Sequence, residues 1–222
     1  TNFNEIINLP EKYKKKKIHV GLPKNKRFNI DFTKKNNISK KVIFIYGGSQ
    51  GSHNLINNFL LVIKTIRNSE LNNLKFIIQC PKKLNIILEK TLKSLKVDYQ
   101  IKTFFNDIDN ILSKTDIAIT RAGAGTINDL IRYKLPSIIF PLPNSIYNHQ
   151  YYNAKFLLDK RACIVLDENN FNLNSYSKSL NELIIKKKYY ENMKESINKI
   201  ILPDTNELIL KTILNKDNEK IK

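Results

Sequence analysis

The 222-residue sequence is short of acidic residues and almost without cysteine. Its 38 lysine and arginine residues face only 20 aspartate and glutamate residues, so the formal net charge is +18. Such a surface favours anionic partners: nucleotides, nucleic acid or an acidic membrane face. Lys, Asn and Ile are all over-used, however, as the codons of an AT-rich genome would dictate. Compositional drift therefore explains the charge equally well.

Other missing features exclude further classes of protein. Cys80 and Cys163 form no CxxC pair, so no disulfide framework is expected, which suits a cytosolic protein. No apolar run reaches the roughly 18 residues of a transmembrane helix. The opening TNFNEIINLP is not a signal peptide and lacks an initiator Met, as in a fragment of a longer chain. The lysines are scattered without an RRM, HTH or KH pattern, so nucleic acid is not an expected partner.

What the chain does contain is a regular alternation after a basic start. Residues 1–40 hold two prolines and little apolar sequence, and we expect a linker or inter-domain segment there. Residues 41–222 are predicted to form one domain. Strands are expected at 41–46, 74–80, 97–104, 116–120, 136–143 and 162–166, helices at 53–68, 81–95, 107–113, 125–134 and 148–158, and a helical remainder at 174–216, broken at Pro203.

Short Ile- and Val-rich strands that alternate with helices predict an α/β fold, a Rossmann-like parallel sheet with helices on both faces. Ligands of such sheets bind beyond the carboxyl ends of the strands, where the strand order reverses. The site is therefore expected among the loops 47–52, 104–107, 121–126 and 141–150.

The first of these loops, in YGGSQGS, joins a strand to a helix and holds three of the six glycines. Gly48 and Gly51 allow the backbone to approach a ligand closely, and Ser49 and Gln50 add side-chain donors. The helix start that follows is an anion site, so the loop predicts phosphate binding. The spacing is neither GxGxxG nor GxxxxGK[ST], which leaves no case for a standard dinucleotide fold or an NTPase. The alternative is a tight turn between strand and helix that needs glycine only for its backbone geometry and binds no ligand.

The second loop, in TRAGAGTINDLI, repeats the pattern with Gly125 before Thr126, a plausible N-cap. Asp129 either complements the helix start electrostatically or accepts hydrogen bonds from two sugar hydroxyls. The third loop brings His149 and Gln150 to a helix start. A lone histidine is usually a solvated or satisfied side chain, but a His-Gln pair at this edge favours hydroxyl binding. Together the loops predict a ligand with a diphosphate and a sugar.

GGSQGS, FFNDI, TRAGAGTINDLI, LPSIIFPLP and NHQYYNA, in this order and spacing, resemble the C-terminal domain of the MurG family over about residues 18–215. The resemblance implies the donor-binding half of a GT-B glycosyltransferase. It implies an inverting, metal-independent and cofactor-free transfer of N-acetylglucosamine from UDP-N-acetylglucosamine to lipid I, which forms lipid II in peptidoglycan synthesis. It further implies a cytoplasmic location, peripheral to the inner face of the cell membrane.

The resemblance also implies residue roles. It assigns Gly48, Ser49, Gln50 and Gly51 to the diphosphate and its sugars, the Phe105 backbone to uracil, Gly125 and Thr126 to phosphate, Asp129 to ribose, and His149 and Gln150 to the N-acetylglucosamine hydroxyls. Asp129 departs from the family, which usually has the longer Glu.

A further departure concerns the acceptor side. In the family, an N-terminal domain carries the candidate base and the site for the undecaprenyl-linked acceptor, and 40 residues are too few for it. The catalytic residues are therefore unknown. The chain is expected to be either truncated or completed by a separate polypeptide, as in the eukaryotic dolichol-linked relative. The alternative is a non-catalytic UDP-sugar-binding subunit that needs such an acceptor-domain partner.

Overall fold

The structure is a computed structural model that describes residues 11, 18, 21–22, 40–47 and 53–219, and the chain divides into two units. Residues 30–200 form the first unit, an α/β domain. Residues 1–29 and 201–222 form the second, whose helix α10 spans Thr205–Glu219. In the second unit, Gly21 has a φ of +78°, and a Cβ there would lie 2.6 Å from the Thr205 hydroxyl. Only glycine therefore fits at that contact.

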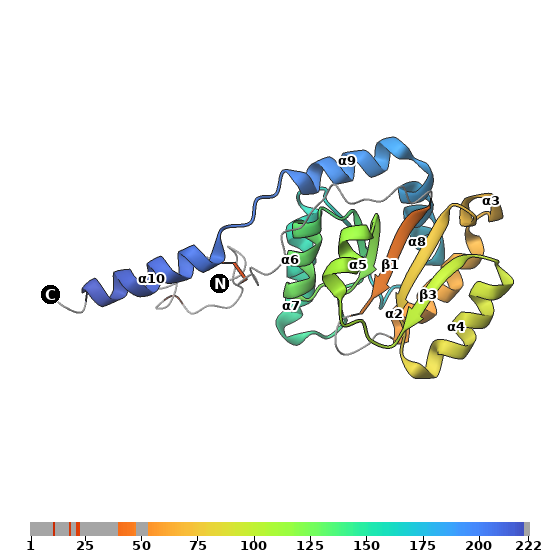
Figure 1. Ribbon diagram of the computed structural model, residues 1–222, viewed down its shortest axis with the longest axis horizontal. Helices are drawn as coiled ribbons and strands as arrows, with labels where there is room; N and C mark the ends of the chain where they lie inside the picture. The colour runs from red at the N-terminus through yellow and green to blue at the C-terminus, as the bar shows by residue number, and fades with distance from the viewer. Residues whose placement is uncertain (1–10, 12–17, 19–20, 23–39, 48–52, 220–222) are drawn as a thin grey trace. The chain divides into compact units, whose positions relative to one another are not determined.

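The α/β domain is built on a six-stranded sheet in which every neighbouring pair is parallel (Figure 1). The strand order is β3-β2-β1-β4-β5-β6, so the order reverses between β1 and β4. The predicted Rossmann-like fold is confirmed, because this is the strand order of doubly wound domains. The strands are β1 (Lys41–Tyr46), β2 (Leu74–Gln79), β3 (Asp98–Lys102), β4 (Ile117–Thr120), β5 (Ser137–Ile139) and β6 (Ile164–Val165).

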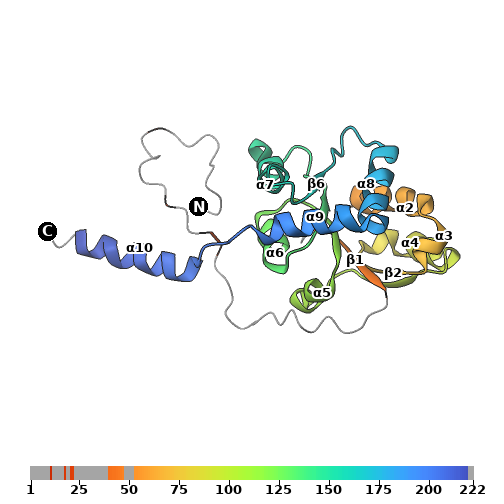
Figure 2. The ribbon, with the colours of Figure 1, turned by 90° about the horizontal axis from the view of Figure 1, so that it is seen from above.

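Helices cover both faces of the sheet (Figures 1 and 2). One face carries α2 (His53–Val62), α4 (Lys82–Ser94) and α8 (Leu173–Ile185), and the other carries α5 (Ile108–Lys114), α6 (Ala124–Tyr133) and α7 (His149–Leu158). The remaining helices of the domain are η2 (Ile63–Thr65), α3 (Asn68–Leu71), η3 (Ile146–Asn148) and α9 (Lys187–Asn198). Within the described residues, none of the helices has the length and apolar character needed to cross a bilayer.

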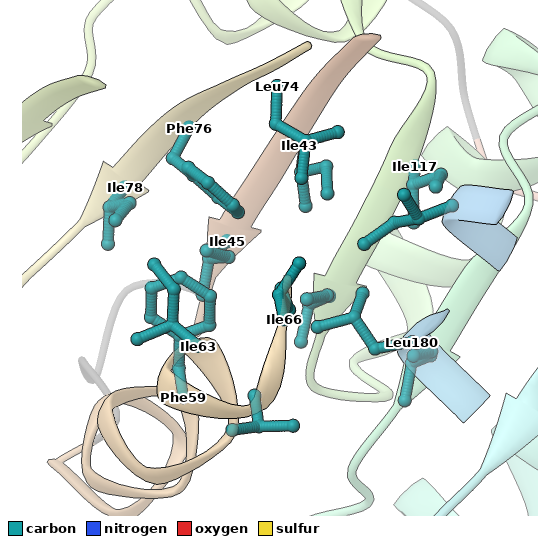
Figure 3. Close-up of a cluster of buried hydrophobic side chains, with 14 of the residues drawn as sticks. Ile43, Ile45, Phe59, Ile63, Ile66, Leu74, Phe76, Ile78, Ile117 and Leu180 are labelled. Carbon is teal, nitrogen blue, oxygen red and sulfur yellow. The ribbon is translucent and has the colours of Figure 1, made fainter. Parts of the chain in front are cut away.

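A hydrophobic cluster lies between the sheet and the layer formed by α2, α4 and α8. Figure 3 shows Ile43 and Ile45 of β1 on the same side of the sheet as Phe59 of α2, and all three are fully buried. Because alternate strand residues point to opposite faces, Phe44 and Tyr46 point toward the α5 and α6 layer. Their rings stack with centroids 4.4 Å apart. Strand β1 is therefore buried on both sides, as its unbroken apolar sequence predicted.

Several predicted boundaries were wrong. The helix expected over 53–68 ends at Val62 and continues as η2, after which the separate helix α3 begins. Ile63 and Ile66 are both buried, so the apolar residues keep the spacing of an α-helix after α2 has ended. The spacing therefore could not reveal where the α-helix ends. The helical remainder breaks at Lys186 as well as before Pro203. After that break, the Tyr190 hydroxyl of α9 donates to the Asp116 carbonyl at the amino edge of the sheet.

Candidate functional site

The predicted site edge lies where the strand order reverses. Tyr46, the last residue of β1, pairs with Thr120, the last residue of β4. The two glycine-bearing connections therefore leave the sheet from neighbouring strands, in the position where doubly wound domains bind ligands. The predicted residues of the first connection are Gly48, Ser49, Gln50 and Gly51. They lie outside the described residues, so their roles stay predictions.

The start of α6 is an uncapped helix end. Gly123 occupies the N-cap position, and no described side chain caps the helix. Thr126 was predicted as the N-cap, which is wrong, because it is the third residue of the helix. A Cβ placed on Gly125 would meet no described atom within 4 Å, so the space over this turn is open. Unpaired amide groups at a helix start suit an anion.

Asp129, the sixth residue of α6, lies beyond the first turn, where helix-start electrostatics fade. Burial, and then the nearby carboxylate of Asp109, raise the pKa of Asp129 to about 6, while Arg132 acts in the opposite direction. Asp109 itself accepts a hydrogen bond from the Tyr133 hydroxyl and lies 3.8 Å from the Arg132 guanidinium. The Asp129 carboxylate is thus a partly buried hydrogen-bond acceptor in a polar group between α5 and α6.

Tyr46 adds a second polar group near Asp129, which no local sequence pattern predicted. Its side chain is almost fully buried at the end of β1. Burial, followed by the charge of Asp129, raises the pKa of the Tyr46 phenol well above its ordinary range. The hydroxyl therefore keeps its proton and remains a buried hydrogen-bond donor.

Gln150 links two of the predicted loops. Its Oε1 accepts hydrogen bonds from the Ala122 amide at 3.2 Å and the Leu142 amide at 2.9 Å. Because both partners are N–H donors, the carbonyl end of the side chain must face them. Asn153 adds a bond from Nδ2 to the Ala122 carbonyl at 3.0 Å. Gln150 thus connects the loop after β4 to the loop after β5. Its Nε2 group is left as the end of the side chain that can donate to a ligand.

His149 is the first residue of α7 and is exposed. Its Nδ1 lies 2.8 Å from the Ile146 carbonyl, which can only accept, so Nδ1 carries the proton. In the neutral ring, Nε2 is then an acceptor. Tyr147 and Asn148, just before it, have φ values of 52° and 53°, a left-handed conformation that asparagine tolerates and that tyrosine adopts at a cost. Such strain is common at binding loops.

Phe105 follows β3 at the same edge, and its ring is anchored. The ring is buried and meets Phe44 edge to face, with centroids 5.8 Å apart. The Lys102 ammonium lies 5.8 Å from the ring centroid. A pocket of about 380 Å³ opens beside Phe105, and Asn106 and Asp107 are among its lining residues. The backbone at Phe105 is thereby held in place, which its predicted contact with a base requires.

Sequence reasoning also missed a buried ion pair. The Arg121 guanidinium donates to both carboxylate oxygens of Glu168, at 2.7 and 3.0 Å. The two residues are 47 positions apart, so no local pattern could have joined them. Within the described residues, no group of three or more His, Cys, Asp or Glu side chains is placed to hold a metal ion.

A parallel α/β domain with helix starts gathered at its switch point belongs to the Rossmann-like class of ligand-binding domains. The model of the glycosyltransferase family 28 C-terminal domain matches residues 42–208. The chain belongs to that family.

Sequence and structure relatives agree with this assignment, and the predicted MurG-family resemblance is confirmed. A transferase of Rickettsia felis is 30% identical over 206 residues, which is 88% of this chain and 57% of the relative. Its name is UDP-N-acetylglucosamine--N-acetylmuramyl-(pentapeptide) pyrophosphoryl-undecaprenol N-acetylglucosamine transferase. The transferase of the same name from Campylobacter jejuni strain 81-176 is 37% identical over 144 residues, which is 65% of this chain and 41% of the relative.

The crystal structure of Acinetobacter baumannii MurG has the same fold, with a TM-score of 0.72 at 20% identity. The match covers 88% of this chain and 55% of that chain. The chain thus spans about half the length of the relatives it matches, and the shared half is the C-terminal domain.

Proposed function

We propose that this chain binds UDP-N-acetylglucosamine at the carboxyl edge of its sheet and is the donor half of an inverting N-acetylglucosaminyltransferase. The reaction would join N-acetylglucosamine to an undecaprenyl-linked acceptor and so form lipid II for peptidoglycan. The observation that carries the proposal is the start of α6 beside the end of β1, where no described side chain caps the helix and no described atom fills the space over Gly125. The names of the relatives supply the identity of donor and acceptor.

Each part of the donor has a candidate partner. The carboxylate of Asp129 would accept from the ribose hydroxyls, and the Phe105 backbone would pair with uracil. His149 Nε2 and Gln150 Nε2 would contact the hydroxyls of the transferred sugar. The diphosphate would lie between the two helix starts, held by Gly48, Ser49, Gln50 and Gly51 on one side and by Gly125 and Thr126 on the other.

In the proposed reaction, a hydroxyl of the acceptor attacks the anomeric carbon as the bond to the UDP oxygen breaks. The acceptor proton passes to a base, which we propose lies outside the matched domain. Negative charge builds on the β-phosphate of the leaving UDP. Amide groups fixed at the start of α6 would stabilise that charge, because they are oriented before the reaction begins.

Calorimetric titration of the whole chain with UDP-N-acetylglucosamine tests the donor site. Ser49→Ala and Asp129→Ala are expected to weaken binding roughly tenfold or more, because each removes a hydrogen-bonding group from the donor. Ser94→Ala and Asp159→Ala are matched controls at exposed positions of α4 and of the end of α7, and they should leave binding unchanged. An intact chain that does not bind, or binding indifferent to both site variants, would reject the site.

A turnover assay distinguishes an active transferase from a non-catalytic subunit that only binds the donor. The transfer needs acceptor-binding groups, and the relatives are longer than the matched part. Product from the chain alone with lipid acceptor would exclude the role of a mere donor-binding subunit. Product only after a second polypeptide is added would favour that role.

We also propose a peripheral membrane contact through α4, on the cytoplasmic face. Ile86 and Ile87 in the middle of this helix are 70% and 53% exposed. Four exposed lysines of the same helix surround them: Lys82, Lys83, Lys90 and Lys93. Lysines near an anionic bilayer contribute about 1 kcal/mol each, and exposed isoleucines can enter its apolar boundary.

Co-sedimentation with phosphatidylcholine vesicles, with and without phosphatidylglycerol, measures this contact. The chain should sediment with the anionic vesicles, and the double variant Ile86→Ser/Ile87→Ser should lose most of that binding. Ile185→Ser, at a half-exposed position of α8, is the control. Equal sedimentation of both variants would remove α4 from consideration.

A further inference from the structure

The ion pair of Arg121 and Glu168 is unusual because both side chains are buried. Their exposed fractions are 8% and 5%. The carboxylate accepts two hydrogen bonds from one guanidinium nitrogen, at 2.7 and 3.0 Å. Desolvating two charges costs as much as their attraction returns, so such a pair is weak support for stability. A role in fixing geometry is the better-founded expectation.

The pair and its neighbours connect four segments at the edge of the sheet. Arg121 follows β4 directly, and its second terminal nitrogen donates to the Phe140 carbonyl after β5, at 3.3 Å. Glu168 follows β6, and its carboxylate accepts a hydrogen bond from the side-chain Nδ2 of Asn54, near the start of α2, at 3.5 Å. The ends of β4, β5 and β6 are thus tied to the helix that follows the first glycine-bearing connection.

The connected segments include the proposed donor contacts. Arg121 immediately precedes Ala122, whose amide and carbonyl are both held by side chains of α7. Gly125 and Thr126 lie four and five residues after Arg121. A displacement of Arg121 would therefore move the start of α6, and with it the amides proposed to face the diphosphate.

We propose that Arg121 and Glu168 are positioning residues, which set the start of α6 against the start of α2 without touching the donor. This inference rests on the proposed donor site. Loss of either side chain should change the distance between the two helix starts. The donor bridges that distance, so its affinity should fall even when the chain remains folded.

The test compares donor affinity with thermal stability in the whole chain. Glu168→Gln and Arg121→Met should each weaken UDP-N-acetylglucosamine binding by a similar factor, about tenfold, and lower the melting temperature by roughly 5 to 15 °C. In the double variant Arg121→Met/Glu168→Leu, an apolar pair replaces the charges. Its melting temperature should recover, but its donor affinity should stay low. Glu182→Gln breaks an exposed ion pair of α8 and is the matched control.

The outcomes separate this inference from the proposed function. If the unmodified chain does not bind the donor, the proposed function and the positioning role are both rejected. If it binds but the double variant regains affinity along with stability, the pair is merely structural. Tighter binding by Glu168→Gln, or a much larger loss in Arg121→Met than in Glu168→Gln, would mean that the Arg121 charge acts on the donor itself. Either result overturns the positioning role.

Discussion

Asp129 is a carboxylate whose surroundings oppose its charge. Burial and Asp109 raise its pKa from an ordinary 3.8 to about 6. Between these two pH values the folded chain keeps a proton that the unfolded chain releases. The free energy of unfolding therefore decreases as the pH rises from 4 to 6 and stays lower above that range. A ligand with two hydroxyl donors would compensate for this cost, as the proposed ribose contact requires.

The variant Asp129→Asn should remove this penalty. At pH 7 its free energy of unfolding is expected to exceed that of the unmodified chain by about 1 to 2 kcal/mol, and at pH 4 the two should be equal. Urea denaturation at a series of pH values measures the difference. Asp159→Asn, at the exposed residue that follows α7, is the control. A difference that does not change with pH would contradict the prediction.

The start of α6 is the element on which donor binding is proposed to depend. Gly125 occupies the second position of this helix, in a conformation that other residues also adopt. Alanine there adds a methyl group to open space and improves helix propensity. The same methyl group would stand where a diphosphate has to approach the amide groups closely.

Gly125→Ala should therefore separate stability from binding. The free energy of unfolding is expected to rise by about 0.5 kcal/mol, while affinity for UDP-N-acetylglucosamine falls roughly tenfold. Denaturation and calorimetry give the two quantities. Lys188→Ala alters the second position of α9 and should leave the affinity unchanged. Retained affinity in Gly125→Ala would show that the donor does not approach this turn.

Strands and helix starts at this edge were predictable because the sequence features that indicate them lie within a few residues of one another. The apolar run of 41–46 sufficed to predict β1, and the glycines after it marked the sheet edge where the donor site is proposed. The switch from α2 to η2 and α3 was not predictable, since Ile63 and Ile66 keep the helical period while the geometry changes. The contacts of Gln150 and Arg121 could not be predicted from the sequence, for a different reason. Each joins segments far apart in the chain, and only the packed sheet edge brings them together.

At the scale of the whole molecule, the fold and the described candidate site belong to one unit. The hydrophobic cluster in Figure 3, the sheet and its covering helices all lie within residues 30–200. The proposed contacts from Phe105 to Gln150 also lie there. Residues 1–29 and 201–222 form a unit of their own, in which Gly21 packs on Pro203 and Thr205.

A chain cut to residues 30–200 should therefore fold and bind the donor. Its thermal transition is expected within roughly 5 °C of that of the whole chain, because the buried apolar area of the domain is retained. Its affinity for UDP-N-acetylglucosamine should stay within about threefold, which is less than 1 kcal/mol. Calorimetry and circular dichroism on the two chains make the comparison. A cut chain that folds but binds much more weakly would show that the second unit contributes to the donor site, and one that fails to fold would show that the domain needs it for stability.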